Sequence, residues 1–244
     1  MDVLEAASLT GAVFTAALVQ VNVGFGFALL AVPLMTVGWR TQDAVVVSTF
    51  LGLLSSGLQA WQGRRIADWP LVRRLTGASL LGIPIGWVVF KQLDPNMLKG
   101  VLGVGVLVAT FLLVRRMDLA RSGPGLEWTA GLLSGALASS LSTNGPPLVF
   151  ALQGRRLPID VFRSTISSVF VASGVVARMA FVVTDEVRRH AVTGMALAVP
   201  ALVLGVTAGQ RVRPHLHEER ARVAVLVLLA AAGVMSIVGA LAAS

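Results

Sequence analysis

Cysteine and tyrosine are both absent from the 244 residues of this chain, and only three histidines are present. The lack of cysteine excludes disulfide bonds, thiol catalysis and cysteine-ligated metals. Charge is scarce as well: 13% of the residues are charged and 55% are hydrophobic, whereas a soluble domain has about 25% charged residues. Together with a mean hydropathy of +0.80, this composition predicts an integral membrane protein.

The basic excess of the chain has a topological explanation. Twenty Lys and Arg residues against 12 Asp and Glu residues give a net charge of +8. Polytopic membrane proteins keep Lys and Arg in their cytoplasmic loops, so we expect a lipid bilayer and no nucleic acid among the partners of this chain. The first residues carry Asp2 and Glu5 where a secretory signal would have a basic segment. The first apolar segment is therefore expected to stay in the protein.

Ten apolar elements of two kinds appear when the chain is divided at its charges and its Gly and Pro clusters. Six are long enough to cross a bilayer, and four form two adjacent pairs, each joined at a glycine-containing break. A helix of about 15 residues reaches only about 22 Å of the roughly 30 Å hydrocarbon core. The pairs are therefore expected to be hairpins of short helices, although two tilted, irregular spans would have the same parity. The six spans are 44–61, 71–90, 98–114, 162–183, 190–210 and 223–241, and the pairs are 8–23 with 24–38 and 126–142 with 144–153.

The distribution of Lys and Arg predicts the orientation in the membrane. When each pair counts as even, 14 basic residues fall on one face and five on the other, and Arg178 alone remains inside a span. The face with 14 is expected to be cytoplasmic, with both termini outside. All five tryptophans fall near the ends of predicted elements, where aromatic belts lie. The larger set comprises Arg64, Arg65, Arg73, Arg74, Arg115, Arg116, Arg121, Arg155, Arg156, Arg163, Arg211, Arg213, Arg220 and Arg222, and the smaller comprises Arg40, Lys91, Lys99, Arg188 and Arg189.

The two halves of the chain resemble each other at an offset of about 116 to 120 residues. Each half, 1–122 and 123–244, contains one hairpin and three crossings, an odd number, so the second half is expected to be inserted upside down relative to the first. Inverted repeats with interrupted helices at matching positions are typical of transporters; duplication for packing alone is the alternative. The parallels are Gly11–Gly26 with Gly131–Pro146, Gly38–Arg40 with Gly154–Arg156, Ser48–Thr49 with Ser164–Thr165, Thr76–Gly77 with Thr193–Gly194, and Pro84 with Pro200.

The two breaks are the candidate binding site. Lipid cannot satisfy free N–H and C=O groups, so irregular backbone inside a membrane must be buried in protein or line a polar cavity, and the breaks are expected to meet. Asn144 followed by Gly145 and two prolines is a typical helix start. Such a start directs free N–H groups and a partial positive charge at an anion. The substrate-binding candidates are Gln20, Asn22, Gly24, Gly26, Ser140, Ser142, Thr143, Asn144, Gly145 and Arg178.

The charges support an anion. All twelve acidic residues lie at the termini, in loops or at span edges, whereas a cation carrier would be expected to place Asp or Glu inside a span. The polar candidates also have a packing interpretation, hydrogen bonding between helices. Arg178 lies five residues before Val183, so it either extends to the outer surface or attracts an anionic substrate. Arg163, at the edge of the same helix, is explained by topology. The spacings Gly82 to Gly86 and Gly131 to Gly135 predict close helix packing.

With these motifs in view, the chain resembles the sulfite exporter TauE/SafE family, also called TSUP. The resemblance is carried by Gly24–Pro33, Gly63–Trp69, Thr143–Leu148 and Phe162–Thr165 leading to Arg178. It implies a transporter of small sulfur-containing anions, such as sulfite or organosulfonates, in the bacterial inner membrane. The sequence departs from the family in having hydrogen-bonding side chains where members are richer in glycine, at Gln20–Asn22 and Ser139–Asn144.

The sequence therefore predicts an all-α polytopic membrane protein with two inverted repeats, each a broken-helix hairpin plus three transmembrane helices. It is expected to be a secondary transporter that moves a small anion by alternating access, with no cofactor and no metal. A passive anion channel and a non-transporting scaffold or enzyme subunit are the alternatives. No set of catalytic residues is present, so the chain is not expected to be an enzyme. Substrate identity, direction of transport, coupling ion and oligomeric state stay open.

Overall fold

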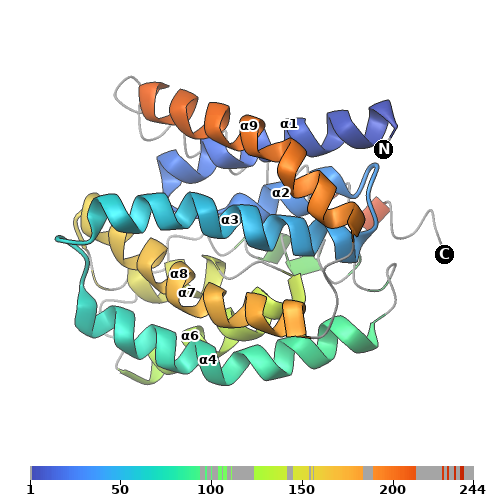
Figure 1. The fold of residues 1–244 in the computed structure, drawn as a ribbon. Helices are drawn as coiled ribbons and strands as arrows, with labels where there is room; N and C mark the ends of the chain where they lie inside the picture. Colours follow the sequence, from blue (N-terminus) through green and yellow to red (C-terminus); the bar gives the residue numbers. More distant parts are fainter. Residues whose placement is uncertain are drawn as a thin grey trace.

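The computed structural model of the chain is all-helical over the residues that it describes, which are 2–93, 124–141, 145–153, 155, 157–183 and 189–212, with single positions within 97–111 and 227–238. The predicted spans 98–114 and 223–241 lie for the most part outside these residues. The helices, shown in Figure 1, are α1 (Val3–Val23), α2 (Phe27–Met35), α3 (Thr41–Gly63), α4 (Trp69–Gln92), α6 (Pro124–Leu141), α7 (Gly145–Gln153), α8 (Ile159–Val183) and α9 (Arg189–Val212).

The helices correspond to the predicted elements. Spans 44–61, 71–90, 162–183 and 190–210 lie inside α3, α4, α8 and α9, and the two predicted pairs are α1 with α2 and α6 with α7. Within the described part of the chain, α1, α3, α9 and the Ile159–Val176 part of α8 are long and apolar enough to cross a membrane. The all-helical architecture with membrane-spanning segments agrees with the prediction from composition.

The first helix is longer than predicted. It begins at Val3 and not near residue 8, because Asp2 and Glu5 form a capping box: the Glu5 N–H donates to Asp2 Oδ1 (2.7 Å) and the Asp2 N–H donates to Glu5 Oε2 (3.1 Å). This reciprocal pair satisfies two N–H groups at the helix start. With 21 residues, α1 reaches about 31 Å at 1.5 Å per residue, the thickness of a hydrocarbon core. Only the second member of the pair, the nine-residue α2, is a short helix.

Each helix pair returns the chain to the end where the pair began. After α2, the Trp39 indole N–H donates to the carbonyl oxygen of Glu5, in the first turn of α1, over 3.0 Å. After α7, Arg155 forms an ion pair with Glu127, in the first turn of α6. Each pair therefore begins and ends at the same end of the bundle, which agrees with the even number of crossings predicted from the sequence.

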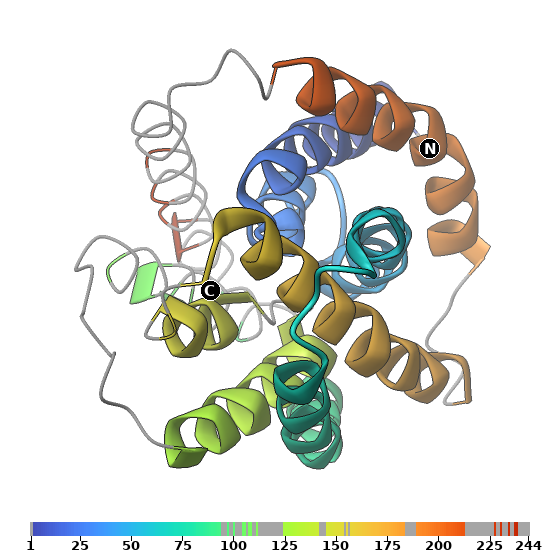
Figure 2. The same cartoon turned by 90° about the vertical axis from the view of Figure 1, so that its left-hand side faces the viewer.

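The two halves pack on each other in a reciprocal way. Helix α1 packs along α9 as α6 packs along α4, while α3 and α8 cross between these two pairs, as Figure 2 shows. Helix α8 runs opposite to α3, since the end of α3 at Gly63 lies against Ser164 near the start of α8, and Thr49 lies against Arg178. In the same way α8 packs on α4 and α9 packs on α3.

Glycine allows the closest of these contacts. A Cβ atom at Gly82 or Gly86 of α4 would lie 2.0 or 1.8 Å from a backbone oxygen of α6, and one at Gly135 would lie 1.8 Å from the oxygen of Ser79. Only a residue without a side chain lets two helix backbones approach so closely. The prediction that the Gly82–Gly86 and Gly131–Gly135 spacings serve helix packing is confirmed, because the two sets face each other across α4 and α6.

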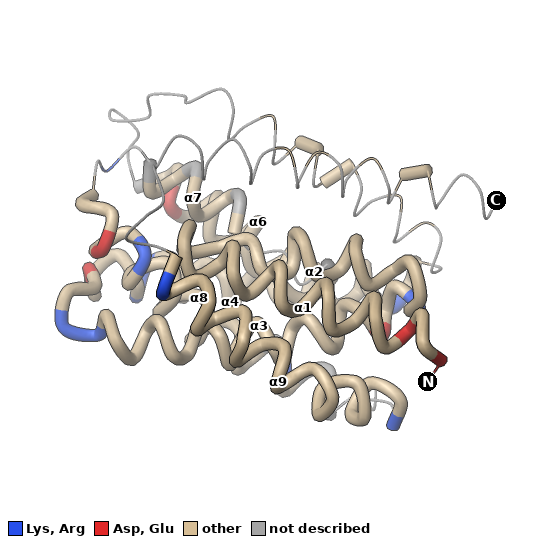
Figure 3. The backbone as a smooth tube through the Cα atoms, turned by 90° about the horizontal axis from the view of Figure 1, so that it is seen from above, with Lys and Arg blue, Asp and Glu red and all other residues tan. Residues whose placement is uncertain are grey.

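Charged and apolar residues are distributed as in a membrane protein. Figure 3 shows described Lys and Arg residues near the ends of the helices. Arg178 differs in lying inside α8, five residues before its end at Val183. Large apolar side chains are exposed on the outer helices, with exposed fractions of 60% for Leu81 and 61% for Leu204. An apolar exterior between two charged ends suits a lipid bilayer.

Candidate functional site

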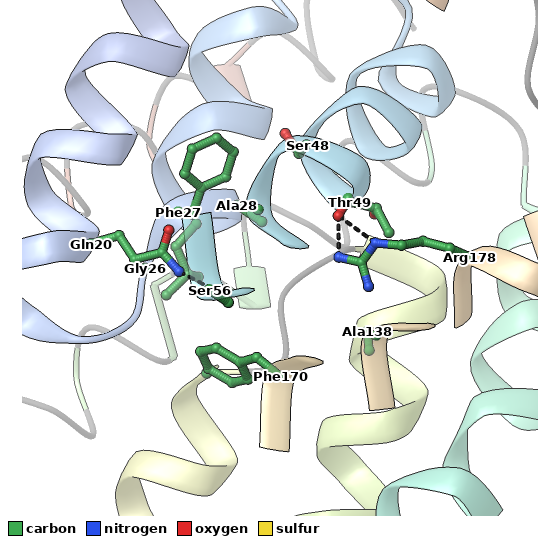
Figure 4. Close-up of a pocket in the computed structure, with 14 residues that line it drawn as sticks. Gln20, Gly26, Phe27, Ala28, Ser48, Thr49, Ser56, Ala138, Phe170 and Arg178 are labelled. Carbon is green, nitrogen blue, oxygen red and sulfur yellow. Dashed lines mark hydrogen bonds between the residues drawn. The ribbon is translucent and has the colours of Figure 1, made fainter. Parts of the chain in front are cut away.

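A cavity of about 40 Å³ lies where α1, α2, α3, α6, α7 and α8 come together. A single water needs about 10–15 Å³ of such space, so the cavity has room for about three water-sized groups. Figure 4 shows its walls. The lining residues are Gln20, Gly26, Phe27, Ala28, Leu29, Ser48, Thr49, Gly52, Ser56, Ala138, Gly145, Phe170, Gly174 and Arg178.

The two helix breaks meet beside this cavity. Gly26, at the break between α1 and α2, and Gly145, at the start of α7, both line it. The break residues also touch directly, since a Cβ atom at Gly145 would lie 3.0 Å from the Phe25 ring. The prediction that the breaks come together is therefore confirmed for the residues described on each side.

The start of α2 faces the cavity because two glycines turn the chain there. Gly24 and Gly26 have φ values of 93° and 99°, in the left-handed region that L side chains adopt only at a cost. The Gly24 N–H closes α1 on the carbonyl oxygen of Gln20 (2.7 Å), and Gly26 then caps α2. The first N–H groups of a helix have no partner within it. The first turn of α2, Phe27 to Leu29, thus brings a partial positive charge to the cavity wall.

Arg178 points into the bundle. Its Nε donates to the carbonyl oxygen of Thr49 in α3 over 2.8 Å, and its Nη2 donates to the same oxygen. The guanidinium lies back over Gly174, where a Cβ atom would fall 2.0 Å from Nη1. This direction, toward the start of α8, is the usual one for a helical side chain. Arg178 therefore does not extend toward Val183 and the outer surface, and the second interpretation from the sequence, attraction of an anionic substrate, stays a prediction.

Three polar atoms of the lining residues have no hydrogen-bond partner among the described residues: Arg178 Nη1, Gln20 Oε1 and Ser48 Oγ. Gln20 and Ser48 are each only 1% exposed. The Gln20 side chain is held by its other end, since its Nε2 donates to Ser56 Oγ over 2.9 Å. Figure 4 shows the Gln20 amide and the Arg178 guanidinium reaching in from opposite sides. Because an unpaired polar group in a buried site costs about 1–3 kcal/mol, these atoms mark a place for a polar ligand.

Arg163 has a structural role that the sequence did not reveal. Its Nη2 donates to the carbonyl oxygen of Asn22 in the last turn of α1, and its Cγ lies against Gly24. A cation at the C-terminal end of a helix satisfies free carbonyl groups and the negative end of the helix dipole. Arg163 thus holds the end of α1 next to the cavity. In the sequence, Arg163 was visible only as a charge at the edge of a predicted span, within the Phe162–Thr165 motif.

The other predicted site residues lie elsewhere or are not described. Asn22 turns toward α9: its Nδ2 donates to Leu18 O over 2.7 Å and lies beside Gly209. Ser140 donates to Ala136 O within α6 (2.8 Å), and Gly24 contacts Arg163. None of these three lines the cavity. Ser142, Thr143 and Asn144 lie outside the described residues, so their role stays a prediction.

The arrangement suits a compact anion. Of the residues that line the cavity, only Arg178 is charged and none is acidic. The guanidinium and the starts of α2 and α7 bring positive charge to one place, where burial strengthens their attraction for a negative ligand. Apolar side chains such as Phe27, Ala138 and Phe170 form another part of the wall.

Comparison with known proteins agrees with this description. The chain is 28% identical over 184 residues to the probable inner membrane transporter protein TsaS of Comamonas testosteroni, which covers 74% of this chain and 75% of that protein. It is 24% identical over 204 residues to the probable sulfite/organosulfonate exporter TauE of Cupriavidus necator, covering 80% and 79%. No solved structure matches the chain. The family model of the sulfite exporter TauE/SafE family matches residues 9–236, nearly the whole sequence. The chain therefore belongs to this family of membrane transporters.

Proposed function

We propose that this protein is a secondary transporter that carries a small anion, sulfite or an organosulfonate, across the inner membrane by alternating access. The observation that carries the proposal is the cavity where Arg178 meets the starts of α2 and α7, with no acidic residue among the described residues of its lining. The names of the two relatives, an inner membrane transporter and a sulfite/organosulfonate exporter, support it. The cavity volume of about 40 Å³ favours the smaller anions of this class.

The proposed architecture is a pair of repeats, 1–122 and 123–244, inserted in opposite orientations. The packing of α1 on α9 and of α6 on α4 supports it. The Trp39–Glu5 hydrogen bond and the Arg155–Glu127 ion pair, which close the two helix pairs, support it as well. The end that carries Arg64, Arg65 and the other predicted cytoplasmic arginines faces the cytoplasm in this proposal, and both termini lie outside. Transporters of this kind expose a central site alternately as one repeat moves against the other.

Flux measured with purified protein in proteoliposomes tests this function. The wild type is expected to give saturable flux of sulfite or of a small alkyl sulfonate. Arg178→Gln removes the one full charge of the cavity and is expected to lower kcat/KM for flux by about a hundredfold, since a charged hydrogen bond in a buried site contributes about 3 kcal/mol. Arg73→Gln, at an exposed arginine outside the cavity, is the matched control. Equal flux in the two variants would contradict the site assignment.

Counterflow separates a carrier from a passive channel. Unlabelled anion on the far side is expected to accelerate uptake of labelled anion, because a carrier returns faster when it is loaded. Absence of trans-stimulation with preserved flux would indicate a channel. A scaffold without transport activity would give neither flux nor thermal stabilisation by any anion, since only a ligand of the native state raises apparent stability.

A further inference from the structure

One unpartnered atom of the cavity lining, Gln20 Oε1, can only accept a hydrogen bond, and this atom constrains the ligand further. Arg178 Nη1 can only donate, as can the N–H groups at the start of α2. Gln20 Oε1 can only accept, and it has no partner among the described residues, whereas the amide nitrogen of the same side chain is engaged by Ser56. Ser48 Oγ can do either. An anion with oxygens alone would satisfy the donors and leave Gln20 Oε1 buried against another oxygen.

We infer that the site binds the protonated, singly charged form of a small oxyanion, such as hydrogen sulfite, and discriminates against the dianion. This inference rests on the proposed function, since it concerns the anion in that same cavity. The ligand oxygens accept from Arg178 and from the start of α2, and the ligand hydroxyl donates to Gln20 Oε1. Gln20 is thus the residue that determines specificity for the protonation state.

The balance of charge leads to the same form of the ligand. The described lining offers one full positive charge, on Arg178, and no titratable acid or base besides it. A monoanion neutralises this guanidinium, whereas a dianion would leave a buried negative charge without a counter-ion, which is strongly unfavourable. Half of the guanidinium is already engaged by the Thr49 carbonyl oxygen, so Nη1 remains to meet the ligand.

Binding of the protonated anion would also couple its transport to that of a proton. The ligand hydroxyl carries its own proton into the cavity, so transport of a proton with the anion needs no carboxylate in the wall. Among the described lining residues no carboxylate is present, and the proton enters and leaves as part of the anion. Movement of sulfite in this form would acidify the compartment that receives it.

Binding measured against pH tests the inference without any variant. Purified protein in nanodiscs is titrated with sulfite under anaerobic conditions and, in parallel, with methanesulfonate, a monoanion of similar size that has no hydroxyl. Affinity for total sulfite is expected to rise by roughly tenfold from about pH 8 to about pH 6 as the monoanion becomes the main species, while affinity for methanesulfonate stays constant. Sulfite affinity that is flat, or that rises with pH, would overturn the inference.

Gln20→Met gives the second readout. Methionine has a similar volume and an unbranched side chain, so the cavity keeps its shape but loses its acceptor. Sulfite affinity at low pH is expected to fall about tenfold and to approach that for methanesulfonate, which changes little. A variant that keeps full preference for sulfite at low pH would contradict the role of Gln20. If neither anion binds the wild type, or if Arg178→Gln leaves both affinities unchanged, the proposed function itself fails, and the two failures are therefore distinguishable.

Discussion

Glu127 and Arg74 form an ion pair across the interface of α4 and α6, with 3.3 Å between Oε2 and Nη1. The Glu127 side chain is 5% exposed, and its other oxygen is bound by Arg155 after α7. One buried carboxylate thus joins α4, the start of α6 and the end of α7. These three segments come from both halves of the chain, so the pair fixes how the second hairpin lies on the first half.

Arg74→Gln is expected to destabilise the protein modestly. Glu127 keeps Arg155 as a partner, and Arg74 is 41% exposed, so solvent screening limits the loss to about 1 kcal/mol. For a chain of this size that corresponds to a fall in apparent Tm of roughly 2–4 °C, measured by thermal unfolding in detergent. Arg73→Gln, at the exposed neighbouring position, is expected to leave Tm unchanged, and equal shifts in both variants would contradict the role of the pair.

Gly86→Ala is expected to destabilise α4, whereas Gly77→Ala in the same helix is not. A Cβ atom at Gly86 would lie 1.8 Å from the backbone oxygen of Ala136, but one at Gly77 would have no atom within 4 Å. Backbone cannot move aside as a side chain can, so we expect a loss of about 2–3 kcal/mol at position 86. At position 77 the higher helix propensity of alanine gives a gain of about 0.5–1 kcal/mol. Chemical or thermal unfolding of the two variants checks the opposite signs.

Gly174→Ala is expected to weaken anion binding without loss of stability. The added methyl group would lie 2.0 Å from Arg178 Nη1, the flexible end of a long side chain, so the guanidinium moves and the helix does not. Displacement of the charge is expected to lower sulfite affinity about tenfold. Gly57→Ala in α3, where a Cβ atom meets nothing within 4 Å, serves as the control in the same titration. Unaltered affinity in Gly174→Ala would show that the position of Arg178 does not matter for binding.

Single cysteines test the orientation, because the chain has none of its own. Ile66 in the α3–α4 turn and Val37 after α2 are 49% and 54% exposed at opposite ends of the bundle. With Ile66→Cys on the cytoplasmic side, a membrane-impermeant thiol reagent applied to whole cells is expected to label Val37→Cys alone. Labelling of Ile66→Cys alone would invert the proposed topology.

Prediction from the sequence succeeded for features that follow from the cost of exposing polar groups to lipid. Backbone breaks must be covered in lipid, so the meeting of Phe25 with Gly145 followed from their existence. The described lining of the cavity likewise contains no acidic residue, as expected from the places of these residues in the chain.

The details of the site could not be predicted, because they depend on helix phase and on partners that are distant in sequence. Gln20 and Asn22 looked equivalent, but two positions on a helix differ by about 200° in direction; Gln20 therefore faces the cavity and Asn22 faces α9. The direction of Arg178 is determined by the Thr49 carbonyl, 129 positions away in the chain. The early start of α1 is the exception, since the Asp2 and Glu5 capping box is a local signal that could have been recognised.

Helix α1 of the first half packs on α9 of the second, and α6 of the second half packs on α4 of the first. Each half therefore supplies a helix that covers a helix of the other. A fragment that ended between the halves would leave α1 without α9 and α4 without α6, so we expect neither fragment to be stable alone. Two such fragments made together would have to pack against each other before either was complete. In the single chain the two halves are covalently linked, so they need not find each other by diffusion. The cavity is completed late, only after the second half has been inserted.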